Sequence, residues 1–338
     1  MTKKIARFAG TASSAVAVAA LTIAAATACT TDAADSGRIS VVASTNVWGD
    51  IAATVAGPDA EVTALISDPG ADPHSFEVTA VQAAQISDAD LIVYNGGHYD
   101  EFIAEAIEGK NKPTVEAVAI AGGAAGDTAA GEEHGEHAHS GEPDHADEAG
   151  HAGEAGHGSE TEHDHSNEHV WYDTHVTGEV AERIAESLGE LDPENAAAYA
   201  GRAAAFAGGL AAVEEITGRI AATRPGQPVL QTEPLASYLV SAAGAEDRTP
   251  PEFQEAIEQG TDPAPAAVAA VRELIASGQV RALVYNVQTE DKTTKDVRAA
   301  AEAAGIPVVE VTETLPEGLD YIRWQTRNAE ALATALSR

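Results

Sequence analysis

Short apolar runs alternate with amphipathic stretches along the first part of the chain, beginning at Arg38. The runs at 39–44, 62–66 and 91–94 predict buried strands. Helices are expected at 48–56, 79–86 and 102–107, and Gly57-Pro58 ends the first of them. Strands and helices that alternate at short spacing predict a parallel sheet with helices on both faces.

A second alternating series follows a long helical pattern. After a helix at 176–188, the pattern predicts a helix from Pro193 to about Thr223, with Asp192 as its N-cap and Pro193 at its first position. Roughly thirty helical residues span about 45 Å, long enough to run along two lobes. The later elements are predicted as strands at 229–232, 282–285 and 308–311 and helices at 235–243, 264–277, 291–304 and 319–336.

These patterns predict an α/β fold of two lobes. Each lobe is expected to be a parallel β-sheet flanked by helices, and one long helix is expected to join the lobes. The expected boundaries are 38–190 for the N-terminal lobe, 191–225 for the connecting helix and 226–338 for the C-terminal lobe.

The first 37 residues have the pattern of an exported lipoprotein. Basic residues at 3, 4 and 7 precede an apolar stretch at 15–28, which is typical of a signal peptide over 1–28. Ala26-Thr27-Ala28-Cys29 resembles a bacterial lipobox, although leucine is commoner at the position of Ala26. The resemblance implies cleavage before Cys29, a diacylglyceryl anchor on its sulfur and a tether over 29–37. The alternative is an ordinary secretory signal followed by a stray thiol.

A histidine-rich polar run interrupts the N-terminal lobe, and we expect a disordered insert at 121–168. Eight histidines lie among Glu, Asp and Gly before His169, at 134, 137, 139, 145, 151, 157, 163 and 165. Imidazoles beside carboxylates suit borderline divalent metals such as zinc. Their spacing matches no zinc-finger pattern, so the run predicts weak, exchangeable sites. The alternative is a solvated acidic linker.

The charge balance favours cations as partners. Asp and Glu number 54 against 19 Lys and Arg, so the formal net charge is −35. Nucleic acid and anionic lipid surfaces are therefore not expected partners. The chain has one Cys and one Met, so a metal site must be built from nitrogen and oxygen, and no intramolecular disulfide can form.

Two histidines stand next to predicted strand ends or at the end of the polar run. His74 follows Pro73 in the loop after the second strand, and His169 is followed by Val170-Trp171. Open α/β sheets bind their ligands in such loops. The alternatives are an exposed loop histidine for His74 and simply the last histidine of the run for His169.

Several motifs occur together in one order, and together they resemble a known family. They are Asp72-Pro73-His74-Ser75-Phe76-Glu77, Asn95-Gly96-Gly97, the histidine-rich insert, His169-Val170-Trp171 and the long connecting helix. The chain is similar to the metal-binding lipoproteins that serve ABC importers of zinc and manganese. The similarity extends from about Ile39 to Leu336, except for the insert.

The resemblance implies a four-residue metal site. Its histidines match His74 and His169, and its third ligand matches Glu233, which opens a segment with Tyr238 at its fifth position after the ligand. The fourth ligand, a carboxylate after the last strand, matches Glu313. Three further readings stay open. Glu310 is the nearest rival of Glu313, Glu233 could instead complement a helix dipole, and Asn286 stands where the family commonly has an acidic residue, so that no role is implied for it.

The resemblance implies a binding protein rather than an enzyme. We expect a monomer, lipid-anchored outside the cell membrane, that captures Zn²⁺ in the cleft between its lobes and delivers it to an ABC-type permease. Mn²⁺ is the alternative metal, because two carboxylates among four ligands match the manganese-type members while the insert matches the zinc-type members. A zinc metallohydrolase is disfavoured, since four protein ligands leave no open position and no HExxH occurs. A surface adhesin or passive metal buffer is the remaining alternative.

Overall fold

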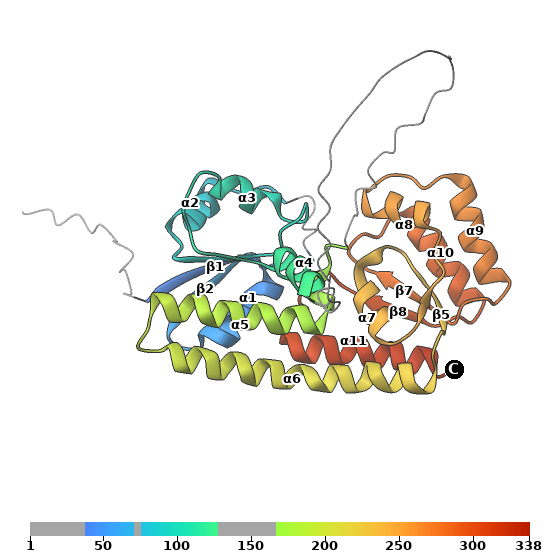
Figure 1. Cartoon of the computed structure of the whole chain (residues 1–338). Helices are drawn as coiled ribbons and strands as arrows, with labels where there is room; N and C mark the ends of the chain where they lie inside the picture. Colours follow the sequence, from blue (N-terminus) through green and yellow to red (C-terminus); the bar gives the residue numbers. More distant parts are fainter. Residues whose placement is uncertain (1–37, 71–75, 128–166) are drawn as a thin grey trace, which may run out of the picture. The chain divides into compact units, whose positions relative to one another are not determined.

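Two parallel sheets organise the part of the chain that the computed structural model describes, residues 38–70, 76–127 and 167–338 (Figure 1). Arg38–Arg338 forms one unit that contains both lobes. The expected signal peptide, Cys29, the tether, His74 and positions 128–166 of the histidine-rich run lie outside the described residues.

The N-terminal sheet has the strand order β2-β1-β3-β4, and all its strands are parallel. Its strands are β1 (Ile39–Thr45), β2 (Ala60–Ile66), β3 (Leu91–Tyr94) and β4 (Thr114–Glu116). Successive side chains of β1 point to opposite faces, so Val41 and Ala43 enter one core and Val42 enters another. Both faces are covered by helices, which explains why the central strands are apolar throughout.

The helices of the N-terminal lobe begin at side-chain caps where the sequence offers them. Thr45 accepts a hydrogen bond from Trp48 N, and Thr79 forms a capping box with Gln82. The helices are α1 (Asn46–Ala56), α2 (Ala80–Asp88), α3 (Glu101–Ile107), α4 (Ala117–Asp127) and α5 (Thr174–Leu191).

The C-terminal sheet repeats this arrangement, with the order β6-β5-β7-β8. Its strands are β5 (Pro228–Gln231), β6 (Glu246–Asp247), β7 (Ala282–Asn286) and β8 (Val308–Val311). Its helices are the 3₁₀ turn η3 (Pro234–Ala236), α7 (Ser237–Ala242), α8 (Pro251–Glu258), α9 (Pro265–Ala276) and α10 (Lys292–Ala303).

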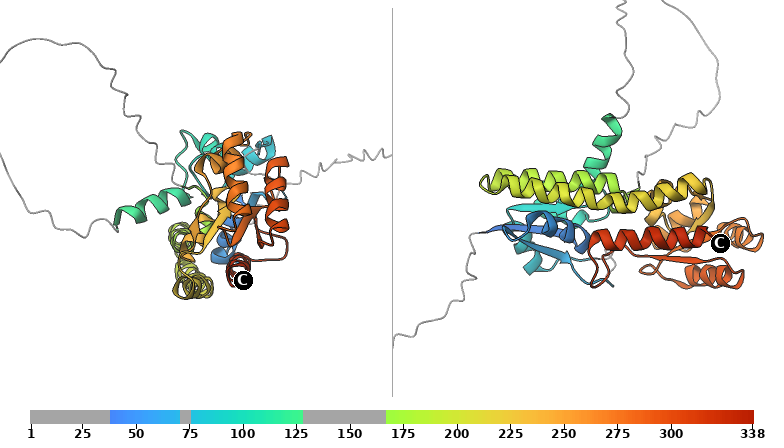
Figure 2. Two further views of the ribbon diagram at one scale, coloured as in Figure 1. Left: turned by 90° about the vertical axis from the view of Figure 1, so that its right-hand side faces the viewer. Right: turned by 90° about the horizontal axis from the view of Figure 1, so that it is seen from below.

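One helix, α6 (Ala196–Thr223), runs along both lobes (Figure 1). Its 28 residues span about 42 Å. Helices α5 and α11 (Tyr321–Leu336) pack beside it (Figure 2). By length and composition α6 could cross a bilayer, but its buried Tyr199, Phe206 and Leu210 face this helical layer. A single hydrophobic cluster includes residues of both lobes, so the lobes share a core.

The predicted fold class is confirmed: two parallel α/β lobes are joined by one long helix. The predicted start of that helix is wrong, because α6 begins at Ala196. Asp192 ends α5 instead, and its carboxylate accepts hydrogen bonds from Asn195 Nδ2 at 2.7 Å and Tyr199 Oη at 3.0 Å. These bonds stabilise the turn between the two helices rather than the first turn of α6.

The expected insert boundary also differs from the structure. Helix α4 continues to Asp127, so residues 121–127 are helical rather than part of an insert. The alanine-rich sequence of α4 favours a helix, and α4 packs against α5. Four short elements had no clear periodic signal and were not predicted, namely β4, β6, α8 and the 3₁₀ turn η2 (Val170–Tyr172).

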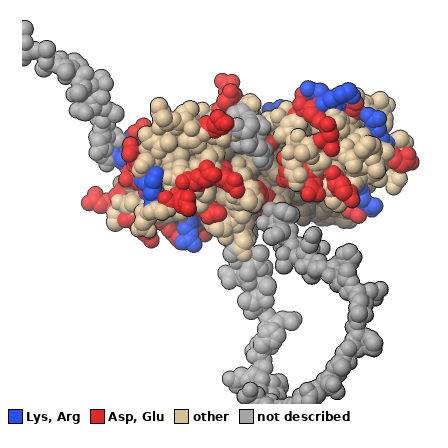
Figure 3. All heavy atoms as spheres, turned by 90° about the horizontal axis from the view of Figure 1, so that it is seen from above, with Lys and Arg blue, Asp and Glu red and all other residues tan. Residues whose placement is uncertain are grey.

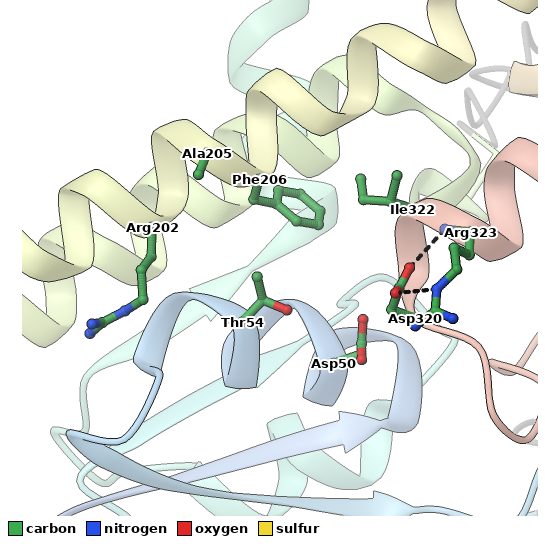
Figure 4. A pocket seen from close by; sticks show the side chains of 8 residues that line it. All are labelled: Asp50, Thr54, Arg202, Ala205, Phe206, Asp320, Ile322 and Arg323. Carbon is green, nitrogen blue, oxygen red and sulfur yellow. Dashed lines mark hydrogen bonds and ion pairs between the residues drawn. The ribbon is translucent and has the colours of Figure 1, made fainter.

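Hydrogen bonds join α1 of the N-terminal lobe to the segment that leads into α11. Asn46 makes two bonds to the main chain of Leu315, both of 2.9 Å, and Asp50 Oδ2 accepts from Tyr321 N at 2.8 Å. Burial raises the pKa of Asp50. A cavity of about 410 Å³ lies beside this joint, lined by Asp50, Thr54, Arg202, Ala205, Phe206, Asp320, Ile322 and Arg323 (Figure 4).

Leu210 offers a test of the shared core, because it is 2% exposed on α6 and packs over Gly178 of α5. Leu210→Ala is expected to lower the free energy of unfolding by about 2–5 kcal/mol, through lost burial and the cavity left behind. Leu191→Ala is the matched control, since Leu191 is 40% exposed and should change stability by about 0.5 kcal/mol. Urea denaturation of the metal-free protein measures both. Equal effects would contradict the assignment of Leu210 to the core.

Candidate metal-binding site

Three of the four candidate ligands are described, and all three are buried. His169 is 1% exposed and directly precedes η2. Glu233 lies two residues after β5 and is 2% exposed, and Glu313 lies two residues after β8 and is 1% exposed. Both carboxylates therefore follow the carboxyl ends of parallel strands, where α/β sheets bind ligands.

The orientation of the His169 ring is set by Asn167. Asn167 Nδ2 donates to the carbonyl of Pro234 at 2.7 Å, which fixes the direction of the amide. Asn167 Oδ1 accepts from His169 N at 3.0 Å and lies 2.7 Å from His169 Nδ1. Because an amide oxygen only accepts, Nδ1 carries a proton, so in the neutral ring the lone pair is on Nε2. A neutral imidazole held in this tautomer is suited to bind a metal through Nε2.

The C-terminal lobe holds the Asn167–His169 segment. Tyr238 Oη donates to the carbonyl of Asn167 at 2.8 Å, and Pro234, the partner of the Asn167 amide, is the neighbour of Glu233. The spacing between Glu233 and Tyr238 noted in the sequence therefore has a physical role here. In the segment 233–238, Glu233 at the start is a candidate ligand, and Tyr238 at the end holds the main chain that leads to His169.

Tyr99 connects His169 to Glu313. Its ring packs edge-on to the His169 ring with centroids 6.1 Å apart, and its hydroxyl donates to Glu313 Oε2 at 3.3 Å. The other oxygen, Oε1, accepts from Asn286 Nδ2 at 2.8 Å. The Glu313 carboxylate is thus oriented by a donor from each lobe.

Glu233 is oriented by Thr289, whose hydroxyl donates to Glu233 Oε1. Glu233 occupies the N-cap position of η3 but makes no capping hydrogen bond there. The helix-terminus reading of this carboxylate therefore has no hydrogen bond to support it.

The described side chains do not form a complete metal site. Within the described ranges, no three His, Cys, Asp or Glu side chains form a group that could hold a metal ion. Glu310, the rival of Glu313, is exposed and its carboxylate lies 2.6 Å from Arg298 Nη2. The cavity beside α1 and α11 contains none of the candidate ligands.

Sequence reasoning did not predict that Tyr99, Asn167, Asn286 and Thr289 orient these ligands, and it noted only Asn286 among them, without a role. Each uses a neutral hydroxyl or amide, and such residues occur throughout the chain without metal-binding meaning. Another signal was Asn95-Gly96-Gly97, which ends two residues before Tyr99. Asn95 Nδ2 donates to the carbonyl of Glu168 at 2.9 Å, so this motif also supports the approach to His169.

Asp100 fixes the turn that contains this motif. Its carboxylate accepts from Asn95 N at 2.7 Å and Gly96 N at 2.8 Å. Gly96 has φ +83° and lies against the side chain of Glu116, where a Cβ would clash. Burial raises the pKa of Asp100 to about 6, and the nearby charge of Glu116 acts in the same direction.

The described candidate ligands offer one imidazole nitrogen and two carboxylates. Nitrogen and oxygen ligands of this kind suit divalent transition metals, with Zn²⁺ bound more tightly than Mn²⁺ in general order. Nothing in this set resembles a nucleophile beside a base.

Comparisons with known proteins agree with this chemistry. The family model described as "Zinc-uptake complex component A periplasmic" matches residues 41–335. The zinc-binding lipoprotein AdcA of Streptococcus pneumoniae is 28% identical over 112 residues, which are 33% of this chain and 22% of that protein. The match thus spans about a fifth of the length of this curated relative.

Several solved structures share the fold. The periplasmic zinc-binding protein TroA of Treponema pallidum has a TM-score of 0.66 at 19% identity, covering 89% of this chain and 100% of that one. FpvC of Pseudomonas aeruginosa, solved with Ni²⁺, has a TM-score of 0.62 at 19% identity and coverages of 89% and 97%. The laminin-binding adhesin Lmb of Streptococcus agalactiae has a TM-score of 0.63 at 20% identity and coverages of 88% and 99%. At these identities, the similarity establishes the fold.

The raised pKa of Asp100 leads to a testable pH dependence. Because its folded pKa of about 6 exceeds the ordinary 3.8, the folded chain binds this proton more tightly than the unfolded chain. The contribution of Asp100 to the free energy of unfolding should therefore rise as the pH falls from about 6 towards 4. Carboxyl NMR titration should give a midpoint near 6, and the difference in stability between wild type and Asp100→Asn should vary over this window. A midpoint near 4 would contradict the assignment.

Proposed function

This chain belongs to the zinc-uptake complex component A periplasmic family, and on that premise we propose that it captures a divalent transition metal, Zn²⁺ first, between its two lobes. It delivers the ion to an ABC-type permease and catalyses no reaction. The metal is cargo, so the site must both hold it and release it.

One observation carries this proposal. The buried His169 ring is connected to the buried Glu313 carboxylate through Tyr99, and to the main chain beside the buried Glu233 through the Asn167 amide and the Pro234 carbonyl. Buried carboxylates are costly unless they are hydrogen-bonded or paired with a cation. A divalent cation can pair with the charges of both carboxylates at the same time.

We include His74 as the fourth ligand. Pro69, five residues before it, has its carbonyl held by Thr314 Oγ1 at 2.9 Å and by Gln288 Nε2 at 3.2 Å, and Thr314 adjoins Glu313. The strand-end turn that leads towards His74 thus lies beside Glu313. Two imidazoles and two carboxylates carry a charge of −2, which neutralises a divalent cation.

The evidence for the choice of metal is divided between Mn²⁺ and Zn²⁺. Two carboxylates among four ligands favour the harder Mn²⁺, whereas affinity order and the histidine-rich run favour Zn²⁺. We assign zinc as the first cargo and manganese as its competitor. Acidic side chains on both lobes of the face in Figure 3 favour the approach of either cation.

The same proposal includes the membrane anchor, the oligomeric state and the partner of the protein. Cys29 carries the lipid anchor, the chain acts outside the membrane as a monomer, and the permease of a metal importer is its partner. These assignments rest on the sequence pattern of the first 37 residues and on family membership.

The ligand assignment is tested with histidine variants. His74→Ala and His169→Ala are each expected to abolish tight zinc binding, measured by competition with a chromogenic chelator. His98→Ala is the matched control, because the His98 side chain is 82% exposed and bound to Glu101 rather than to a candidate ligand. A histidine variant that keeps wild-type affinity would remove that residue from the site.

The metal choice is tested at Glu233. Glu233→His exchanges an oxygen ligand for a nitrogen ligand and removes one negative charge, which weakens manganese more than zinc. We expect wild type to prefer zinc and the variant to widen the ratio of the manganese and zinc dissociation constants. Wild type that binds manganese at least as tightly as zinc, with the ratio unchanged in the variant, would overturn both the metal and the role of Glu233.

A further inference from the structure

We infer that Gln288 is a positioning residue for metal capture. Its side-chain amide ties the main chain that carries Glu313 to the N-terminal lobe. This inference rests on the proposed function, since it concerns how long the Glu313 carboxylate stays in place around a bound ion.

The oxygen of the Gln288 amide holds the Glu313 main chain. Oε1 accepts from Glu313 N and, at 3.3 Å, from Thr314 N. On the nitrogen side, Nε2 donates to Thr314 Oγ1 at 2.9 Å. Main-chain N–H groups only donate, so the amide atom that faces Glu313 N and Thr314 N is the oxygen, and the orientation of the amide is fixed.

The nitrogen of the same amide reaches the other lobe. Nε2 lies 3.2 Å from the Pro69 carbonyl, and Thr314 Oγ1 donates to that carbonyl at 2.9 Å. Pro69 sits in a turn after β2 in which Asp68 Oδ1 accepts from Gly70 N at 2.8 Å. The anchor point is therefore a constrained turn with a proline ring, not a free loop end.

The strand end that supplies Gln288 also orients both candidate carboxylates. Asn286 Oδ1 accepts from Gln288 N at 3.0 Å, while Asn286 Nδ2 donates to Glu313 Oε1. Thr289, the next residue, donates to Glu233. Positions 286–289 thus fix the side chain and the main chain of Glu313 together with the side chain of Glu233.

Loss of the Gln288 amide should keep all four ligand residues in the chain but make the position of Glu313 less fixed. Residues that orient metal ligands typically change metal affinity by about 10–100-fold when they are replaced. We call the hydrogen bonds of Gln288 and Thr314 to the Pro69 carbonyl the strap. The change should lie mainly in faster release of the ion, because the strap affects how long Glu313 stays against the ion and not how fast the ion arrives.

The experiment compares wild type with Gln288→Met, which keeps the length of the side chain and removes its hydrogen bonds. We expect zinc release, followed by stopped-flow mixing with excess chelator, to accelerate about 10-fold, with a similar rise in the dissociation constant. Gln279→Met is the control, because Gln279 is exposed and its amide contacts only Ser277 among the described residues. It should release zinc at the wild-type rate.

A double-variant cycle separates positioning from general stability. Thr314→Val removes the second donor to the Pro69 carbonyl, so the two substitutions act on one strap and their effects on the release rate should not multiply. A purely structural role would lower the unfolding free energy of the metal-free protein without this coupling. If the effects of the two substitutions on the release rate multiply, and the metal-free protein loses stability, the inference is overturned.

The outcomes also distinguish this inference from the proposed function. If wild type has no tight zinc site, the proposed function fails. If wild type binds tightly and Gln288→Met releases zinc at the wild-type rate, the role of Gln288 is wrong. Should Gln288→Met fail to fold, Thr314→Val alone decides by the same release assay, and an unchanged rate would refute the strap.

Discussion

The buried carboxylate of Glu313 is the constraint on which the arrangement of the lobes depends. A charge at 1% exposure requires donors that stay in place, and they come from Tyr99 of one lobe and Asn286 of the other. The lobes must therefore keep a fixed relation. The helical layer of α5, α6 and α11, with the core cluster shared by both lobes, provides that relation.

Two of the described segments that carry candidate ligands are held in part by the lobe opposite to their own in chain order. The segment at His169 precedes the long helix, yet Pro234 and Tyr238 beyond that helix hold it through Asn167. The segment at Glu313 follows the long helix, yet Leu315 is held by Asn46 of α1. Separation of the lobes would break the bonds that orient both candidate ligands, so coordination and lobe contact are coupled.

Neutral side chains do most of this orientation, and their neutrality has a physical reason. Asn286 donates to Glu313 through its amide; an aspartate there would place a second acceptor and a second charge against the same oxygen. Thr289 and Tyr99 likewise donate without adding charge. These three residues therefore orient the carboxylates without adding charge beside them.

The periodicity of apolar residues by itself determined the fold class, the two lobes and the long helix, because burial on both faces leaves a pattern in each strand and helix. The family resemblance, rather than the periodicity, pointed to Glu233 and Glu313. Only the tertiary structure decided the rest. Asp192 closes a turn because Asn195 and Tyr199 reach it, and Asn167, Asn286 and Gln288 acquire roles only when distant segments meet. A single amide or hydroxyl has no periodic signature, so its partner must be seen in space.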